Sequence, residues 1–212
     1  MKGLLLKDIY TLKATLRIYA VMIIIYRIIG AETGNTSLLY TFFVLACAII
    51  PMTAIAYDDR CTWNSYTASL PVSRTKVALS KYVLGLLSLA FCIVCDVSAF
   101  FVSDKINPAE FTAALISASC TAVIYMSFTI PVVYKLGAEK SRIAILVVML
   151  LPAAVIFGGM YIAVKVGWHI TVPEQIVENI LRNGLLIFSA ASILILIASM
   201  AISVSIYKKR DF

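Results

Sequence analysis

Charged residues are scarce in this sequence. They make up 14% of its 212 residues, whereas 62% of the residues are apolar; soluble domains have roughly 25% charged and roughly 45–50% apolar residues. A chain of this length cannot bury so much apolar surface in one core surrounded by water, so the composition indicates an integral membrane protein. It excludes a disordered chain and a disulfide-stapled secreted domain. The excess of 18 Lys and Arg over 11 Asp and Glu is then typical of cytoplasmic loops and not of a nucleic-acid-binding protein.

Residues that usually carry chemistry are scarce as well. The chain has one histidine, His169, and five cysteines, an odd number that predicts no disulfide framework. Cys92 and Cys95 form a C-x-x-C pair inside an apolar run, where cysteine behaves as a small hydrophobic residue. There is no G-x-x-x-x-G-K-[S/T] sequence to hold a nucleotide, no H-E-x-x-H, and no credible pair of nucleophile and base. We therefore expect no catalytic centre, metal site or cofactor on this chain.

Apolar segments long enough to cross a bilayer are what the sequence has in quantity. A spanning helix needs about 20 apolar residues. Four segments meet this length without a single charge: residues 38–57, 111–134, 143–164 and 183–207. A fifth segment, 77–102, contains Lys81 and Asp96. A sixth, 14–31, has an uninterrupted apolar core of only residues 18–26 between Arg17 and Arg27, whose long side chains can reach the two interfaces. The sequence thus predicts an all-α membrane protein with six transmembrane helices in one domain, residues 1–212.

The distribution of positive charge predicts the orientation. Six spans place both termini on one side, and that side carries 14 of the 18 Lys and Arg residues. The opposite side carries only Arg27, Lys105, Lys165 and Arg182. Because cytoplasmic loops are enriched in Lys and Arg, both termini are expected in the cytoplasm.

The N-terminal segment, residues 1–13, is expected to form a helix that lies in the inner interface. Leu5, Ile9, Leu12 and Leu16 recur at helical spacing, and lysines supply charge between them. A simple amphipathic extension of the first span would give the same pattern.

The outer loop, residues 168–182, has a helical signature of its own. Thr171 and Glu174 have the spacing of a capping box, and the apolar residues that follow share one face. We expect a short helix that rests at the outer interface or dips back into the bilayer.

The longest cytoplasmic loop, residues 58–76, is expected to contain a short helix. Trp63, Tyr66 and Leu70 fall on one face, and Pro71 ends the segment. Large aromatic residues on such a helix either anchor a partner protein or sit at the lipid interface. The pattern leaves both interpretations open.

Asp96 is the most informative ionisable residue within the spans. A carboxylate at the centre of a spanning helix costs roughly 2.5–3.5 kcal/mol on insertion scales. We expect it either to line a polar cavity, to pair with Arg27 or Lys165 from another helix, or to reach the outer interface. Small residues four apart, such as Ser199 and Ser203, predict close contacts between helices.

Several of these residues together resemble a known family. The opening, MKGLLLKDIY, is similar to that of small bacterial ABC-transporter permeases of the second, export-type class. The loop resembles theirs more specifically, through an acidic pair, an aromatic pair, a Ser-Leu-Pro-Val-Ser-Arg run and a Lys-Tyr pair that begins the next span. In this chain these are Asp58-Asp59, Trp63 and Tyr66, residues 69–74, and Lys81-Tyr82.

The resemblance implies a transmembrane subunit that has no ATPase of its own. Two permease subunits, here expected to be a homodimer, would pair in a bacterial cell membrane, and separate ATPase subunits would dock from the cytoplasm and carry ATP and Mg²⁺. Residues 1–13 would be the elbow helix, and the loop 58–76 would carry the coupling helix. The ATPase contacts implied are Asp58, Asp59, Trp63, Tyr66, Leu70, Pro71 and Arg74.

The layout is most similar to exporters of amphipathic toxin peptides such as the phenol-soluble modulins, and relatives of these confer resistance to antimicrobial peptides. The resemblance therefore implies peptide export, with Asp96 along the substrate path. The alternative is a self-sufficient membrane protein, either a secondary carrier or a membrane enzyme. A carrier would be expected to have internal repeats and broken helices around a midplane site, and the sequence has no evident repeat.

Overall fold

The computed structural model describes residues 2–33, 37–61, 63–69, 71–100, 108–165 and 174–209, with side chains chiefly within 3–25, 49–100, 111–143 and 183–209. Nearly all of these residues are helical, and no strand occurs among them. The all-α expectation is therefore confirmed. The helices are α1 (Lys2–Thr11), α2 (Lys13–Thr33), α3 (Ser37–Arg60), α4 (Trp63–Ser69), α5 (Arg74–Phe100), α6 (Pro108–Lys165) and α7 (Glu174–Lys209).

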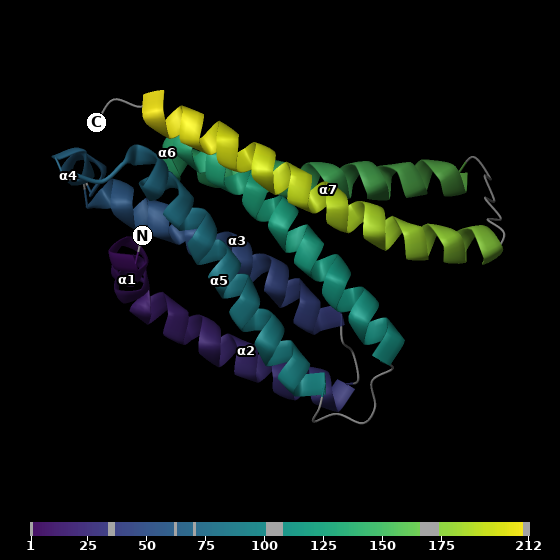
Figure 1. Cartoon of the computed structure of the whole chain (residues 1–212). Helices are drawn as coiled ribbons and strands as arrows, with labels where there is room; N and C mark the ends of the chain where they lie inside the picture. The colour runs from purple at the N-terminus through teal and green to yellow at the C-terminus, as the bar shows by residue number, and fades with distance from the viewer. Residues whose placement is uncertain are drawn as a thin grey trace.

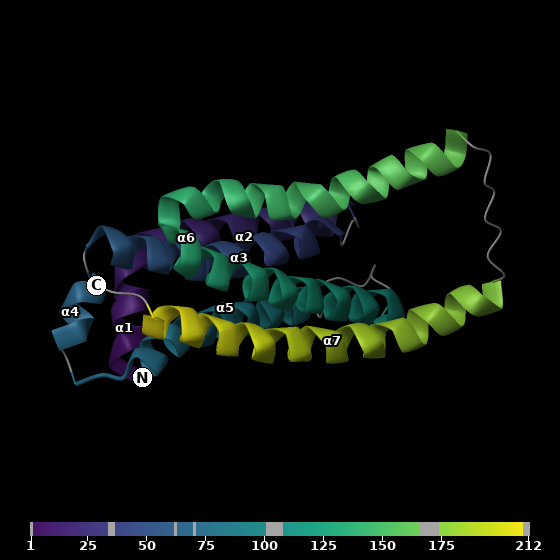
Figure 2. The ribbon, with the colours of Figure 1, turned by 90° about the horizontal axis from the view of Figure 1, so that it is seen from above.

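The long helices run side by side along one direction, and α1 lies across that direction (Figures 1 and 2). The helix α1, the short helix α4 and the C-terminal end of α7 all lie at one end of the bundle, which we call the basic end. Helix α3 packs against α5 and α6, and α7 packs against α6 and α5. The segments that the sequence assigns to the more positive side thus gather at one end.

The 58 residues of α6 are two helices joined by a turn. Gly137 interrupts them with φ 77° and ψ 165°, a conformation outside the helical region. Only glycine adopts such a positive φ without strain, because it has no Cβ. Figure 2 shows the chain reversing at the basic end, from the teal half of α6 to its green half. The break lies between the expected segments 111–134 and 143–164, which the sequence predicted as two separate spans.

Three helices among the described residues are long and apolar enough to cross a membrane. They are Arg74–Ser98, Phe111–Gly137 and Asn183–Lys209, and they coincide with three of the six expected spans. The other three expected spans are helical, within α2, α3 and the second half of α6. Their role as spans stays a prediction.

The outer loop differs from the expectation in one respect. Residues 174–182 are the first turns of α7 and continue into the span without a break, so the structure has no separate loop helix there. Once Glu174 begins a helix, nothing in the sequence up to Lys209 is proline, and the apolar run therefore extends the same helix. Thr171 and Val172 lie outside the described residues.

The core sits where α3, α5, α6 and α7 meet near the basic end. Its largest fully buried side chains include Tyr82, Ile55, Met126 and Tyr207. Gly85 allows this close packing, because a Cβ at that position would lie 3.0 Å from Cγ of Pro51 and would collide with the sulfur of Met126. Gly85 therefore lets α5 approach α3 and α6 closely.

Polar side chains also join α7 to the other helices. The hydroxyl of Tyr82 shares hydrogen bonds with Oγ of Ser199 (2.6 Å) and of Ser203 (2.7 Å), and Ser199 bonds the main-chain oxygen of Ser127. The close helix contact expected from the Ser199 and Ser203 spacing is thus confirmed. In the hydrocarbon region such hydroxyls need a partner inside the protein.

Candidate coupling site

The corner between α1 and α2 is fixed by packing. Leu12 stands between the two helices and is 1% exposed. Its amide donates to the carbonyl of Asp8, and the amide of Leu16 donates to the carbonyl of Leu12, so helical bonding continues around the corner. Leu5, Leu12 and Leu16 of the expected apolar stripe pack onto α3 and α5, on a cluster formed by Ile50, Ala54 and Leu84.

Four charged side chains meet behind this corner, and we call them the ion quartet: Lys7, Asp8, Asp58 and Lys81. Lys81 Nζ lies 2.8 Å from both carboxylate oxygens of Asp8 and 2.6 Å from Oδ2 of Asp58. Lys7 Nζ lies 2.9 Å from Oδ1 of Asp8 and also bonds Oδ1 of Asp58. Each cation therefore contacts both carboxylates, and the quartet joins α1, α3 and α5.

The quartet is nearly inaccessible to solvent. The side chains of Asp8, Lys81 and Asp58 are 2%, 3% and 7% exposed, and that of Lys7 is 24% exposed. Two positive and two negative charges cancel, which offsets the penalty of removing them from water. Removing one member would leave an uncompensated buried charge, which typically costs about 3–5 kcal/mol. The quartet thus links three helices, and the stability of this link depends on each of its four members.

Helix α4 contacts the ion quartet through its first residue, Trp63. Nζ of Lys7 lies 4.4 Å from the centroid of the Trp63 ring, within the range of a cation–π interaction. The rings of Trp63 and Tyr66 are 5.3 Å apart and tilted by 43°. Nε1 of Trp63 is buried and has no hydrogen-bond partner among the described residues. Tyr66, by contrast, is 57% exposed, so α4 has one aromatic ring turned inward and one available on its surface.

The other residues of the expected contact set lie in different surroundings. Asp58 points into the quartet and away from the surface, Asp59 is half-buried, and Pro71 is exposed. The guanidinium of Arg74 donates to the carbonyl of Lys208 at 2.9 Å, which ties the start of α5 to the end of α7. Leu70, the third member of the expected helix face, lies outside the described residues.

Asp96 lies in the other half of α5. It is 5% exposed and therefore points into the protein. Nearby, Phe100 stacks on Phe111 of α6 with ring centroids 4.6 Å apart. The side chains of the two partners considered for Asp96, Arg27 and Lys165, lie outside the described residues.

Sequence reasoning missed the ion quartet as a unit. It noted Lys81 as an interruption of an apolar segment, and it assigned Asp58 to a protein contact. The available signal was Lys81 within one apolar segment and Asp58 directly after another. A charge that is buried requires a partner of opposite sign, so two such residues could have been expected to pair. Which charges pair depends on how α1, α3 and α5 pack.

The fold and the site define a polytopic α-helical membrane protein with a short amphipathic helix and a small aromatic helix at its basic end. The chain belongs to the ABC-2 family: the family model described as ABC-2 family transporter protein matches residues 3–208. It is therefore the membrane domain of an ABC transporter, a permease subunit. No match was found among curated proteins. Permeases of this family normally work with an ATPase subunit.

Proposed function

We propose that this chain is the membrane-spanning subunit of an ATP-driven exporter and that a separate ATPase docks on α4 from the cytoplasm. The observation that carries the proposal is the arrangement of α4. Its exposed Tyr66 contacts Trp63, and Trp63 contacts Lys7 of the ion quartet. These successive contacts would transmit a movement of α4 to the helices of the membrane domain.

The ion quartet, which Trp63 contacts, belongs to three helices. Lys7 and Asp8 belong to α1, Asp58 to α3 and Lys81 to α5, and all four share one set of ion pairs. A group of buried charges in this arrangement has discrete geometries and resists gradual deformation. Movement of α4 during ATP binding would therefore shift α1, α3 and α5 together.

The orientation follows from the charge distribution. The basic end would face the cytoplasm, because cytoplasmic segments are enriched in Lys and Arg. Both termini would then be cytoplasmic, in a bacterial cell membrane, with α1 as the interfacial elbow helix and α4 as the coupling helix. ATP and Mg²⁺ would bind the ATPase.

The assembly would contain a second permease subunit, most simply a second copy of this chain. Helix α7 offers a broad apolar face for lipid or for that copy. Leu186 and Leu194 are each 68% exposed there, and Ile197 is 59% exposed.

The direct test is co-purification. A tagged full-length chain, extracted in mild detergent from the cells that make it, should retain an ATPase whose Mg²⁺-dependent activity vanadate inhibits. An eluate with no such activity, from a chain that is folded and monodisperse, would contradict the proposal and would favour a self-sufficient carrier or membrane enzyme.

The substrate proposed is an amphipathic peptide of the toxin or antimicrobial class, from the resemblance of the chain to peptide exporters. Asp96 would line its path, where one carboxylate favours the passage of lysine side chains. We expect Asp96→Asn to lower the ATP-dependent transport of a dye-labelled amphipathic Lys/Leu peptide several-fold in inverted membrane vesicles. The control variant Glu174→Gln, at the first residue of α7, should transport at the normal rate.

This expectation would be wrong if vesicles with Asp96→Asn and vesicles with Asp96→Leu both transported the peptide like wild type at equal protein abundance. That result would leave the ATPase proposal intact, since it concerns only the path.

A further inference from the structure

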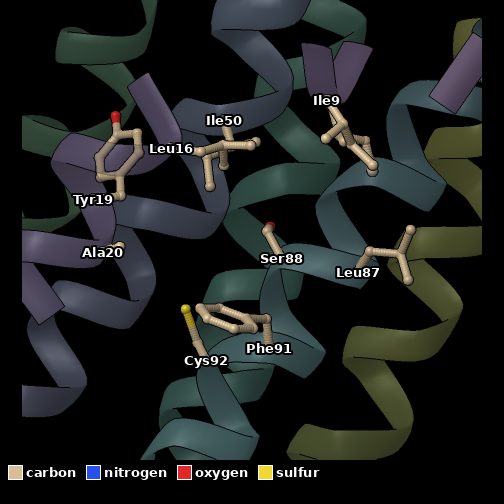
Figure 3. A pocket seen from close by; sticks show the side chains of 10 residues that line it. Ile9, Leu16, Tyr19, Ala20, Ile50, Leu87, Ser88, Phe91 and Cys92 are labelled. Atoms are coloured by element: carbon tan, nitrogen blue, oxygen red, sulfur yellow. The ribbon is translucent and has the colours of Figure 1, made fainter. Parts of the chain in front are cut away.

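A cavity of about 260 Å³ lies between the α1–α2 corner, α3 and α5. Figure 3 shows Leu16 and Tyr19 of α2 on one side and Phe91 and Cys92 of α5 on the other, with Ser88 between them. The lining is almost entirely apolar, and the hydroxyl of Ser88 already donates to the carbonyl of Gly85 in its own helix at 2.7 Å. A lining with so few polar groups offers water almost no hydrogen-bond partners, so this site suits hydrocarbon.

The cavity is a groove open on its outer side. Ile9, Leu87 and Phe91, which line it, are 43%, 50% and 58% exposed. Leu87 and Phe91 belong to Arg74–Ser98, one of the helices long and apolar enough to cross a membrane. The groove would therefore open toward the acyl chains of the bilayer and not toward water.

Positive charge flanks the part of the groove that α2 forms. Lys13 and Arg17 are exposed, and each stands three residues before a lining residue of α2, Leu16 and Ala20 respectively. Residues three apart on a helix are neighbours on its surface. The apolar lining alone does not favour one lipid over another, because the acyl chains of all lipids are as apolar as the lining. Basic side chains beside it do select among lipids, since clustered Lys and Arg attract anionic headgroups.

We propose that this groove binds one anionic phospholipid, with an acyl chain between α2 and α5 and the phosphate at Lys13 and Arg17. The proposal needs the basic end at the membrane surface but is independent of the ATPase. A second copy of the chain fits the groove less well. A symmetric contact through this face would place the Lys13 and Arg17 pairs of two copies close together, and like charges repel.

The test is photo-crosslinking of the full-length chain in nanodiscs with equal amounts of phosphatidylglycerol and phosphatidylcholine. A benzophenone amino acid replaces Phe91, which lines the groove, or Leu194, a control on the exposed face of α7. At position 91 we expect phospholipid adducts in which phosphatidylglycerol exceeds phosphatidylcholine by roughly fivefold or more, as one or two basic residues near the surface provide. At position 194 the two lipids should react about equally.

Charge variants give the decisive comparison. Lys13→Gln with Arg17→Gln should reduce the enrichment at position 91 to the level of position 194. The conservative pair Lys13→Arg with Arg17→Lys should retain it, and so should the matched control Lys208→Gln with Lys209→Gln at the end of α7. The proposal is overturned by adducts with a second copy of the chain, by equal reaction of both lipids at position 91, or by enrichment that ignores Lys13 and Arg17.

Discussion

Lys81→Met should strongly destabilise the membrane domain, although it changes side-chain volume little. It removes the cation that contacts both Asp8 and Asp58, and Lys7 alone would then face two buried carboxylates. Breaking a buried ion pair on one side costs about 3–5 kcal/mol. For a chain of this size, that corresponds to a decrease in midpoint temperature of roughly 6–20 °C. Thermal unfolding in detergent measures it.

The matched control is Lys76→Met on the same helix, where the lysine is exposed. It should melt within a few degrees of wild type, because surface substitutions change stability little. Equal melting temperatures for the two variants would show that the quartet does not hold α1, α3 and α5 together.

A double variant separates stability from coupling. Asp58→Leu with Lys81→Met removes one charge of each sign, which leaves Lys7 and Asp8 as a neutral pair. Apolar replacement of both partners in a buried pair is often neutral for stability. We therefore expect the double variant to recover much of the lost stability. ATP-dependent transport should stay impaired, because α3 and α5 no longer share an ion pair with α1.

Trp63→Ala combined with Tyr66→Ala should uncouple the permease from its ATPase. The pair supplies the exposed ring of α4 and the ring that contacts Lys7. Truncating an aromatic hot spot typically costs 2 kcal/mol or more, which is about 30-fold in affinity. The variant should therefore lose the ATPase on purification, while its helical content stays unchanged because α4 stands outside the long helices.

The control for this variant is Phe128→Ala with Phe188→Ala, which removes two exposed rings from α6 and α7. That chain should keep the ATPase. Retention of the ATPase by the α4 variant at the wild-type ratio would place the docking surface elsewhere.

The fold was largely predictable because its signals are local. Apolar runs of 20 or more residues specify the long helices, and Gly137 breaks α6 between two of them. The aromatic spacing and Pro71 indicated the short helix that the structure has at Trp63–Ser69. Even the corner at Leu12 continues the stripe of apolar residues visible in the sequence.

The candidate site was only half predictable. Trp63 and Tyr66 lie on one helix, so their proximity follows from spacing alone. The ion pairs join residues 51 and 73 positions apart, and Lys7 contacts Trp63 across two different helices. Such contacts depend on how the elements pack. Local propensity also could not reveal that Asp58 points inward while Tyr66 remains exposed.

The two interpretations of the aromatic helix, an anchor for a partner protein or for lipid, make opposite predictions at Tyr66. A benzophenone amino acid at that position in the full-length chain, irradiated in the cells that make it, captures whatever lies against α4. We predict an adduct with a protein that contains a G-x-x-x-x-G-K-[S/T] nucleotide-binding loop, and its loss when Trp63→Ala is added. A phospholipid adduct in its place would contradict a coupling role for α4.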